Sequence, residues 1–394
     1  MSAAEVVFWV AAAFVLYPYV VYPLLLAVAG RLFRRPVRRR KGFRPSVSFV
    51  TCAHNEAGRI EARLTELLAV LEATDVPGEI VVVCDGSTDG TAALVRLLAD
   101  RSVRLLEMPA RSGKAAALTA GAAAATGEIL VFGDVRQTWA PDALELLLEN
   151  FADEQVGAVS GDLVVLSGPG AVEGVGLYWK LEKWMRRRES LVGSQVGVTG
   201  AISAVRRELF RPIPPGTILD DVYWPLNVAM QGRRVIHDSR AFAYDRLPQR
   251  AGDEFRRKVR TQAGNLQLIT RLPAALLPWR NPTWFALLSH KLARLAVPWA
   301  LLALFVAGWF LDGPFYVAAL LAQVACYGLA LAGLTSGRGG TLASVPASFV
   351  VLNAAAWAAF WVWVSGRADR SWVKVTYDYQ GVREVVTPTQ GATR

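Results

Sequence analysis

The chain has 394 residues, of which 53% are hydrophobic, and it carries a formal net charge of +10. This length and apolar content exceed what one ordinary soluble domain needs. The three cysteines lack the spacing of a disulfide framework, and three histidines argue against a histidine-rich metal site. We expect reduced thiols, as in a cytoplasmic enzyme.

The apolar residues are concentrated at the two ends of the chain. Residues 6–29 contain no charged side chain, and three more uncharged runs cover 295–311, 313–337 and 339–366. Each run approaches the ~20 residues that a membrane-spanning helix needs. We therefore expect an integral membrane protein with a transmembrane anchor at 1–30 and about three transmembrane helices at 291–366.

A basic juxtamembrane linker is expected at 31–44, because residues 31–41 hold seven basic side chains and no acidic one. Positive charge stays on the cytoplasmic side of a membrane. We therefore expect the protein in the cell (inner) membrane, with its N-terminus on the outer side and the middle of the chain in the cytoplasm. The linker explains much of the net charge and favours membrane lipids over nucleic acid as a partner.

Two parts near the C-terminus complete the membrane region. Proline and tryptophan interrupt residues 271–290, which we expect to lie in the membrane interface as an amphipathic segment. The tail, 367–394, follows three spans and would lie outside, yet Arg367, Arg370 and Lys374 argue for the inside. Both placements of the tail remain open.

Residues 45–270 are the expected cytoplasmic domain. Short apolar runs indicate strands at 47–50, 80–83, 103–106 and 129–132, with helices at 59–71, 91–99 and 113–125 between them. This alternation predicts a Rossmann-like α/β fold with a mostly parallel sheet. Right-handed crossovers place all these strand ends on one edge of the sheet.

The second half of the domain is less regular. We expect an amphipathic helix at 179–188, a strand at 201–205, a helix at 222–231 and a basic helix at 255–267 that Asp253 caps.

Asp85 follows the strand at 80–83 and precedes a helix that begins near Thr91. A carboxylate at this place suits the base or ribose of a nucleotide, and the helix N-terminus suits a phosphate. Calcium is excluded, since Arg96 occupies the position where an EF-hand loop requires a bidentate glutamate. A plain turn without a ligand is the alternative reading of this segment.

Five short motifs stand in order along the domain: Ala53-His54-Asn55-Glu56, Asp85-Gly86-Ser87-Thr88-Asp89-Gly90, Gly113-Lys114, Asp134-Val135-Arg136 and Leu219-Asp220-Asp221. Their order and spacing resemble the family-2 glycosyltransferases of GT-A fold. With the flanking spans, the chain is similar to the membrane-embedded branch that includes cellulose, hyaluronan and chitin-oligosaccharide synthases.

The resemblance implies a nucleotide-sugar donor, a UDP- or GDP-sugar, bound by residues from the first four motifs. It implies that Asp85 holds the base or ribose beside Glu56, and that Lys114 approaches the diphosphate. A lysine point charge suits phosphate, although a solvated lysine at a helix start is the alternative. The full donor-binding set is Ala53, Asn55, Glu56, Asp85, Gly86, Ser87, Lys114 and Asp134.

Asp134 matches the first aspartate of the family's DxD motif, which implies that it binds Mg²⁺ or Mn²⁺. Arg136 stands where the second aspartate of that motif belongs. An arginine at this position offers charge to the diphosphate itself. The resemblance still favours a metal-dependent enzyme.

Asp221 matches the family's general base, which removes the proton from the acceptor hydroxyl. The adjacent Asp220 repels it, and such repulsion raises one carboxyl pKa toward a useful range. One of the two residues also has the chemistry of a helix cap, and we expect Asp220 to cap and Asp221 to catalyse.

Arg257 and Arg260 match the polar positions of the Gln/Arg-x-x-Arg-Trp motif of processive synthases, whereas Thr261 replaces its tryptophan. Three residues apart, the two arginines are expected on one helical face, where they would bind the diphosphate or acceptor together with Arg136 and Asp220. A basic face against lipid headgroups is the alternative. The absent tryptophan argues against long-chain processivity.

The expected function is inverting sugar transfer to an extracellular polysaccharide or a glycolipid, with a glycan or lipid-linked acceptor. Hexosyl and N-acetylhexosaminyl transfer both fit this expectation. Two alternatives are transfer to a polyprenyl phosphate and a non-catalytic nucleotide-binding or scaffold subunit of a polysaccharide synthase. The first acceptor is already an anion and needs no strong base; the second role is suggested by Arg136 and Thr261.

Overall fold

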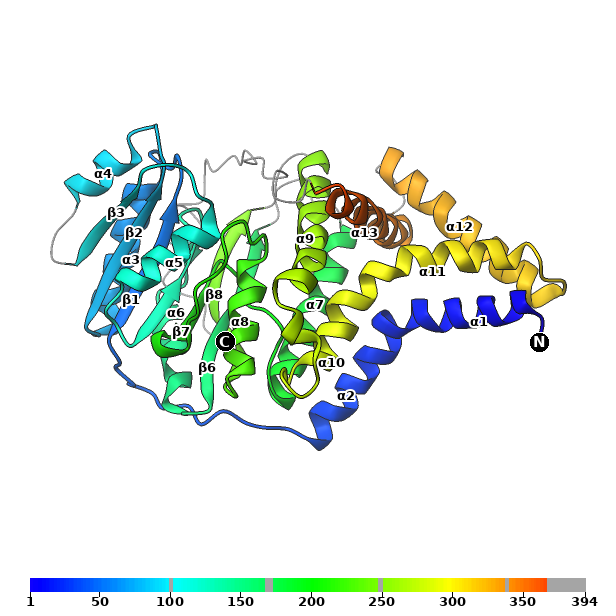
Figure 1. The fold of residues 1–394 in the computed structure, drawn as a ribbon, viewed down its shortest axis with the longest axis horizontal. Helices are drawn as coiled ribbons and strands as arrows, with labels where there is room; N and C mark the ends of the chain where they lie inside the picture. Colours follow the sequence, from blue (N-terminus) through cyan, green and yellow to red (C-terminus); the bar gives the residue numbers. More distant parts are fainter. Residues whose placement is uncertain (99–101, 167–172, 247–250, 337–339, 367–394) are drawn as a thin grey trace.

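The computed structural model describes residues 1–366 except 99–101, 167–172, 247–250 and 337–339. The predicted tail lies outside these described residues. An α/β domain occupies one end of the molecule, and the long apolar helices extend from the other (Figure 1).

The first half of the sheet contains four parallel strands, as predicted. They are β1 (Val47–Ala53), β2 (Gly78–Asp85), β3 (Val103–Met108) and β4 (Ile129–Phe132). The helices α3 (Ile60–Thr74), α4 (Thr91–Leu97) and α5 (Lys114–Ala124) connect them. The strand order β3-β2-β1-β4 places the ends of β1, β2 and β4 at one sheet edge.

The second half extends the sheet to eight strands in the described residues, in the order β3-β2-β1-β4-β7-β6-β8-β5. The added strands are β5 (Thr138–Trp139), β6 (Val156–Leu166), β7 (Ser203–Arg206) and β8 (Arg234–Arg246). Strand β7 runs antiparallel to both neighbours, while β6 and β8 pair in parallel. The sheet is therefore mixed but mostly parallel.

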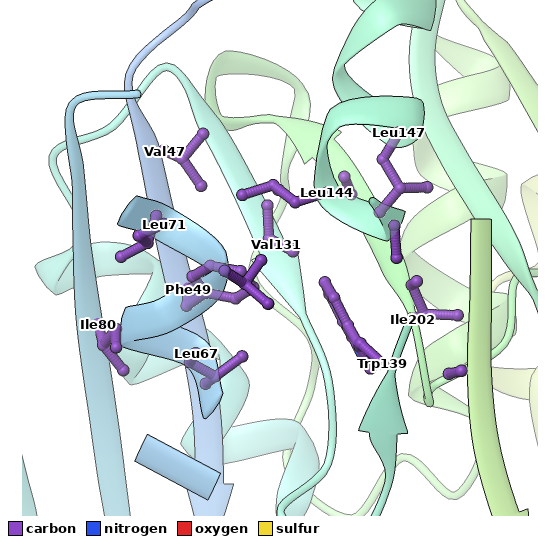
Figure 2. Close-up of a cluster of buried hydrophobic side chains, with 14 of the residues drawn as sticks. Val47, Phe49, Leu67, Leu71, Ile80, Val131, Trp139, Leu144, Leu147 and Ile202 are labelled. Carbon is purple, nitrogen blue, oxygen red and sulfur yellow. The ribbon is translucent and has the colours of Figure 1, made fainter. Parts of the chain in front are cut away.

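Helices cover both faces of the sheet because successive strand residues point to opposite sides. On one face, α3 and α6 (Ala143–Glu149, followed by the 3₁₀ turn Asn150–Ala152) bury Leu67, Leu144 and Leu147 against Phe49 and Trp139 (Figure 2). On the other face, α5 packs against Val50 of β1 and Val83 of β2, and α8 (Asp220–Met230) packs against β6 and β8.

Gly121 allows α5 to approach this second face closely. A Cβ at this position would lie 2.4 Å from Cγ1 of Val50 and 2.8 Å from Cγ2 of Val83. The alanine-rich sequence of α5 thus serves the close packing of helix on sheet.

In the part of the chain that the structure describes, four helical segments are long and apolar enough to cross a membrane: Ala3–Leu32, Trp284–Gly308, Pro314–Thr335 and Leu342–Val364. The first is built from α1 (Ala3–Leu16), the π-helical η1 (Tyr17–Val21) and α2 (Tyr22–Leu32). The others comprise α10 (Trp284–Ala286), the π-helical η5 (Leu287–Leu292) and α11 (Ala293–Gly308); α12 (Pro314–Ser336); and α13 (Gly340–Val364). The number and order of candidate spans agree with the sequence.

Two helix boundaries differ from the prediction. The second candidate span already begins at Trp284, within the segment 271–290 that was expected to lie in the interface; only the 3₁₀ turn Pro273–Leu276 and the loop after it precede the helix. The basic helix is α9 (Ala251–Arg271), which starts before Asp253. Asp253 therefore lies in its first turn and is not its N-cap.

A buried ionic cluster joins the α/β domain to the apolar helices. Helix α7 (Glu173–Val192) supplies Glu182 and Glu189, and the fully buried ring of His290 bridges them through Nε2 at 2.8 Å and Nδ1 at 2.7 Å. Glu182 also binds Lys291 and Arg294, each at 3.1 Å. The sequence prediction identified α7 as an amphipathic helix but missed this cluster.

Candidate active site

The carboxyl ends of the parallel strands and the start of α8 surround one cavity. Its lining includes Lys114, Asp134, Asp220 and Asp221, together with apolar and small side chains from β1, β4 and α8. Four residues from three of the predicted motifs therefore meet at the edge of the sheet, as the strand topology requires.

The loop after β1 is hydrogen-bonded to the loop after β2. Asn55 adopts a left-handed backbone conformation (φ +55°). Its backbone N–H donates to Oγ of Ser87 at 3.1 Å, and its side-chain Oδ1 accepts the backbone N–H of Thr88 at 2.8 Å. The backbone N–H of Glu56 donates to Thr91 Oγ1 at 2.9 Å. Asn55, Glu56 and Ser87 thus form one rigid rim, and their predicted contact with the donor stays a prediction.

Gly86 is required by this rim. Its φ is +60°, and a Cβ there would lie 2.4 Å from the backbone nitrogen of Arg111. Ala53 ends β1 beside this turn and is fully buried, so its predicted contact with the donor stays a prediction.

Asp85 organises the loop that precedes Lys114. Its Oδ1 accepts the backbone N–H of Ser112 at 2.6 Å, and its Oδ2 accepts that of Gly113 at 2.8 Å. The side chain is 5% exposed. Each carboxylate oxygen has a further lone pair for a ligand, so a base or ribose contact remains a prediction alongside this structural role.

Lys114 stands at the centre of the cavity. Its Nζ lies 2.7 Å from Oδ1 of Asp134 and 3.8 Å from Oδ2 of Asp220. Burial by itself lowers the pKa of Lys114, but the Asp134 and Asp220 carboxylates outweigh it and raise that pKa above its ordinary value. For Asp134, burial raises the pKa, but Lys114 and Arg136 outweigh it and hold that pKa below the ordinary value. The ammonium group is thus a positive charge among carboxylates, on a side chain that is still 36% exposed, and its contact with the diphosphate stays a prediction.

Asp221 has the electrostatics of a general base. Burial, and then the neighbouring Asp220 carboxylate, raise its pKa to about 6, against the opposing charges of Lys114, Arg186 and Lys291. Such a carboxyl group is ionised at neutral pH yet retains a useful proton affinity. Asp220 is the first residue of α8, whose N-cap position is Leu219 and has no side-chain cap bond. The expectation that Asp220 caps the helix was wrong.

Arg136 is directed toward a carboxylate on β8. Its Nε donates to Oδ2 of Asp245 at 3.0 Å, and the amide of Gln137 donates to the same oxygen at 3.0 Å. Arg136 still contributes positive charge near Asp134. Its expected contact with the diphosphate stays a prediction.

The two arginines of α9 have different partners. Arg257 is bound by Glu254 on the same helix, at 2.8 Å, and is 44% exposed. Arg260 is partly buried and interacts electrostatically with Asp220, Asp221 and Asp134; burial, only partly offset by these carboxylates, lowers its pKa. Both arginines lie on α9, three residues apart, but Arg257 pairs with Glu254 one turn earlier; their joint contact with the diphosphate or acceptor stays a prediction.

Among the described residues, no group of three or more His, Cys, Asp or Glu side chains gathers to hold a metal ion. Asp134, the residue that the DxD resemblance assigns to the metal, lines the cavity together with Asp220 and Asp221. Mg²⁺ and Mn²⁺ sites often use one or two carboxylates plus substrate phosphates and water. The residues present therefore fit a cation that arrives largely held by its substrate.

Comparison with known proteins decides the family. Residues 48–213, which contain β1 to β4 and most of the cavity, match the sequence profile described as glycosyl transferase family 2. These residues form a family-2 glycosyltransferase domain.

A solved structure is similar to the chain over nearly its whole length. The mannosyltransferase PcManGT from Pyrobaculum calidifontis, solved in complex with GDP-Man and Mn²⁺, is 26% identical, with a TM-score of 0.67. The match covers 92% of the present chain and 99% of PcManGT. The GT-A fold predicted from the five motifs is confirmed.

Two curated relatives belong to polysaccharide biosynthesis. The poly-beta-1,6-N-acetyl-D-glucosamine synthase of Staphylococcus aureus is 23% identical over 233 residues, which are 57% of the present chain and 56% of the synthase. The succinoglycan biosynthesis protein ExoO of Rhizobium meliloti is 36% identical over 126 residues, 32% of the present chain and 35% of ExoO. The chain spans about half of the synthase and a third of ExoO.

Proposed function

We propose that this family-2 glycosyltransferase transfers a sugar from a nucleotide diphosphate to an acceptor hydroxyl at a membrane, with inversion of the anomeric carbon. The acceptor belongs to an extracellular polysaccharide or a glycolipid. The observation that carries the proposal is the carboxylate of Asp221, with a pKa raised to about 6, beside the cation of Lys114 in one cavity. A base and a phosphate-binding cation are the two groups that direct displacement at the sugar requires.

Asp221 accepts the proton of the attacking hydroxyl in this mechanism. Lys114 and Arg260 stabilise the negative charge that grows on the departing diphosphate. A divalent cation held by Asp134, when bound, neutralises phosphate charge as a Lewis acid. Asp220 keeps Lys114 in place and raises the proton affinity of Asp221.

The donor is a GDP- or UDP-linked sugar in this proposal. The similarity to PcManGT over almost its full length supports GDP-mannose and Mn²⁺ as the first combination to test. The similarity to the poly-N-acetylglucosamine synthase supports an N-acetylhexosamine donor as the second.

The catalytic domain faces the cytoplasm of the inner membrane in this proposal. The basic linker after the first candidate span supports that orientation. The ionic cluster around Glu182 holds α7 against the apolar helices and so keeps the cavity near the membrane, where a lipid-linked or growing glycan acceptor arrives.

The proposal is tested with the full chain in lipid nanodiscs and a panel of GDP- and UDP-sugars, with Mg²⁺, Mn²⁺ or a chelator. NMR coupling constants of the product report the anomeric configuration. We expect one donor to be used, metal to be required, and the configuration to be inverted. Retention would refute the direct displacement, and nucleotide binding without turnover on any donor would favour a non-catalytic role.

A further inference from the structure

Gln137 is a buried glutamine whose amide joins two carboxylates. This residue is only 1% exposed. The amide nitrogen lies 3.0 Å from Oδ2 of Asp245 and 3.5 Å from Oδ2 of Asp134. Its amide oxygen finds no hydrogen-bond partner among the described residues. A buried amide with an unmet acceptor is costly, so its place beside Asp134 calls for a reason.

Asp245 anchors the residues that follow Asp134. This carboxylate on β8 is 8% exposed, and a single oxygen accepts both the Gln137 amide and Nε of Arg136, each at 3.0 Å. Further along, the backbone N–H of Trp139 donates to Oε1 of Glu66 at 2.6 Å. The chain after Asp134 is thus fixed at both ends.

This arrangement compensates for the missing second carboxylate of the DxD motif. Arg136 would repel a cation at Asp134, because its charge is felt there. Asp245 holds the guanidinium in an ion pair, which offsets that charge. Gln137 restrains the second oxygen of Asp134, while Lys114 holds the first. Groups that orient a ligating carboxylate tune metal affinity although they never touch the ion.

We propose that Gln137 and Asp245 are positioning residues that prepare Asp134 for a divalent cation in place of the absent carboxylate at position 136. The inference rests on the metal-dependent part of the proposed function. It assigns a role to a β8 residue outside the five motifs.

The test measures Mn²⁺ binding without turnover. The full chain in detergent is titrated with Mn²⁺ in the presence of GDP, and separately of UDP, and free Mn²⁺ is followed by electron paramagnetic resonance. We expect Gln137→Leu to weaken Mn²⁺ affinity by about 10- to 100-fold, with the metal-free nucleotide affinity unchanged. Asp245→Asn should weaken it similarly, because Arg136 is then released toward Asp134.

Gln195→Leu is the matched control. Gln195 is also 1% exposed, also has an unpaired amide oxygen among the described residues, and donates only to the carbonyl of Ile236, at 3.1 Å. A merely structural role for Gln137 would lower the melting temperature as Gln195→Leu does and leave Mn²⁺ affinity unchanged.

Equal Mn²⁺ affinity in Gln137→Leu, Asp245→Asn and Gln195→Leu would overturn the inference. Absence of Mn²⁺ binding to the wild-type protein would also overturn it, while sugar transfer in chelator would leave the transferase proposal standing. Intact Mn²⁺ binding with these variant effects but no turnover would support the inference and contradict the proposed function instead.

Discussion

The ammonium nitrogen of Lys114 lies 2.7 Å from Oδ1 of Asp134. This ion pair crosses the cavity from the start of α5 to the end of β4, and it also brings Asp220 within 3.8 Å of the same nitrogen. In the absence of a donor, Lys114 therefore compensates the carboxylates. A donor diphosphate and its cation would separate this ion pair: the ammonium group would bind phosphate, and Asp134 would bind the metal.

Replacing Lys114 should weaken donor binding. In Lys114→Met, the diphosphate loses a charged partner and the carboxylates of Asp134 and Asp220 repel it. We expect the dissociation constant for GDP or UDP, measured by calorimetry, to rise about 10- to 100-fold. Lys183→Met, which removes a similar ion pair with Asp162, should leave it unchanged; equal effects would contradict this role.

The two arginines of α9 should behave differently. Arg260→Met removes a cation near Asp220, Asp221 and Asp134, so we expect kcat to fall about 10²- to 10³-fold, as for other lost transition-state donors. Arg257 is bound by Glu254, and Arg257→Met should change kcat less than about threefold, within the range of an exposed ion pair. Comparable losses in steady-state assays would show that both residues reach the leaving group.

Activity should depend on pH through Asp221. Its pKa is raised to about 6, and in the proposed mechanism the ionised form is the base. The rate constant kcat/KM should therefore be maximal above pH 6 and fall about tenfold per unit below it. Because the Asp220 carboxylate contributes to the raised pKa, Asp220→Asn should move this acidic limb to lower pH. A limb that stays in place, or moves upward, would contradict the coupling between the two residues.

Glu182 should contribute strongly to stability. It binds His290, Lys291 and Arg294 at 3.1 Å or less. Burial raises its pKa, but interactions with His290, Lys291 and Arg186 outweigh burial and hold that pKa well below the ordinary value. The stabilisation is present above about pH 4.5 and is lost as the pH falls. Glu182→Gln should lower the free energy of unfolding by about 3–5 kcal/mol, because the buried cations then lose their carboxylate partner.

Thermal unfolding in detergent measures this effect. Glu107→Gln is the control, because its ion pair with Arg96 is exposed and exposed pairs contribute about 0–1 kcal/mol. A melting temperature of Glu182→Gln equal to that of the control would mean that the cluster does not hold the helices together.

Much of the fold followed from local sequence signals. The apolar β-branched runs at β1, β2 and β4 and the uncharged spans are long and regular, so periodicity alone located them. The order of the four parallel strands then brought Lys114 and Asp134 to one edge. The strand pairings of the mixed second half were not predicted, because β6 and β8 pair across more than 70 residues and this pairing depends on tertiary packing.

The site was predicted in its composition but not in its pairings. Asp245 and Gln137 were missed, since a single carboxylate on β8 and a glutamine after Arg136 carry no motif of their own. The capture of Arg257 had a sequence signal, an acidic residue three positions earlier on the helix. The bridge from Glu182 to Glu189 through His290 had a weaker one, two glutamates seven residues apart on an amphipathic helix.

The most direct test of sugar transfer by Asp221 is the release of nucleoside diphosphate from the donor that the screen identifies. Wild-type protein and Asp221→Asn are compared at pH 7.5 in nanodiscs with acceptor lipids, and nucleotide affinity is measured in parallel. We predict a loss of at least about 10³-fold in release at unchanged nucleotide affinity. Release by Asp221→Asn at the wild-type rate would contradict the assignment of Asp221 as the base.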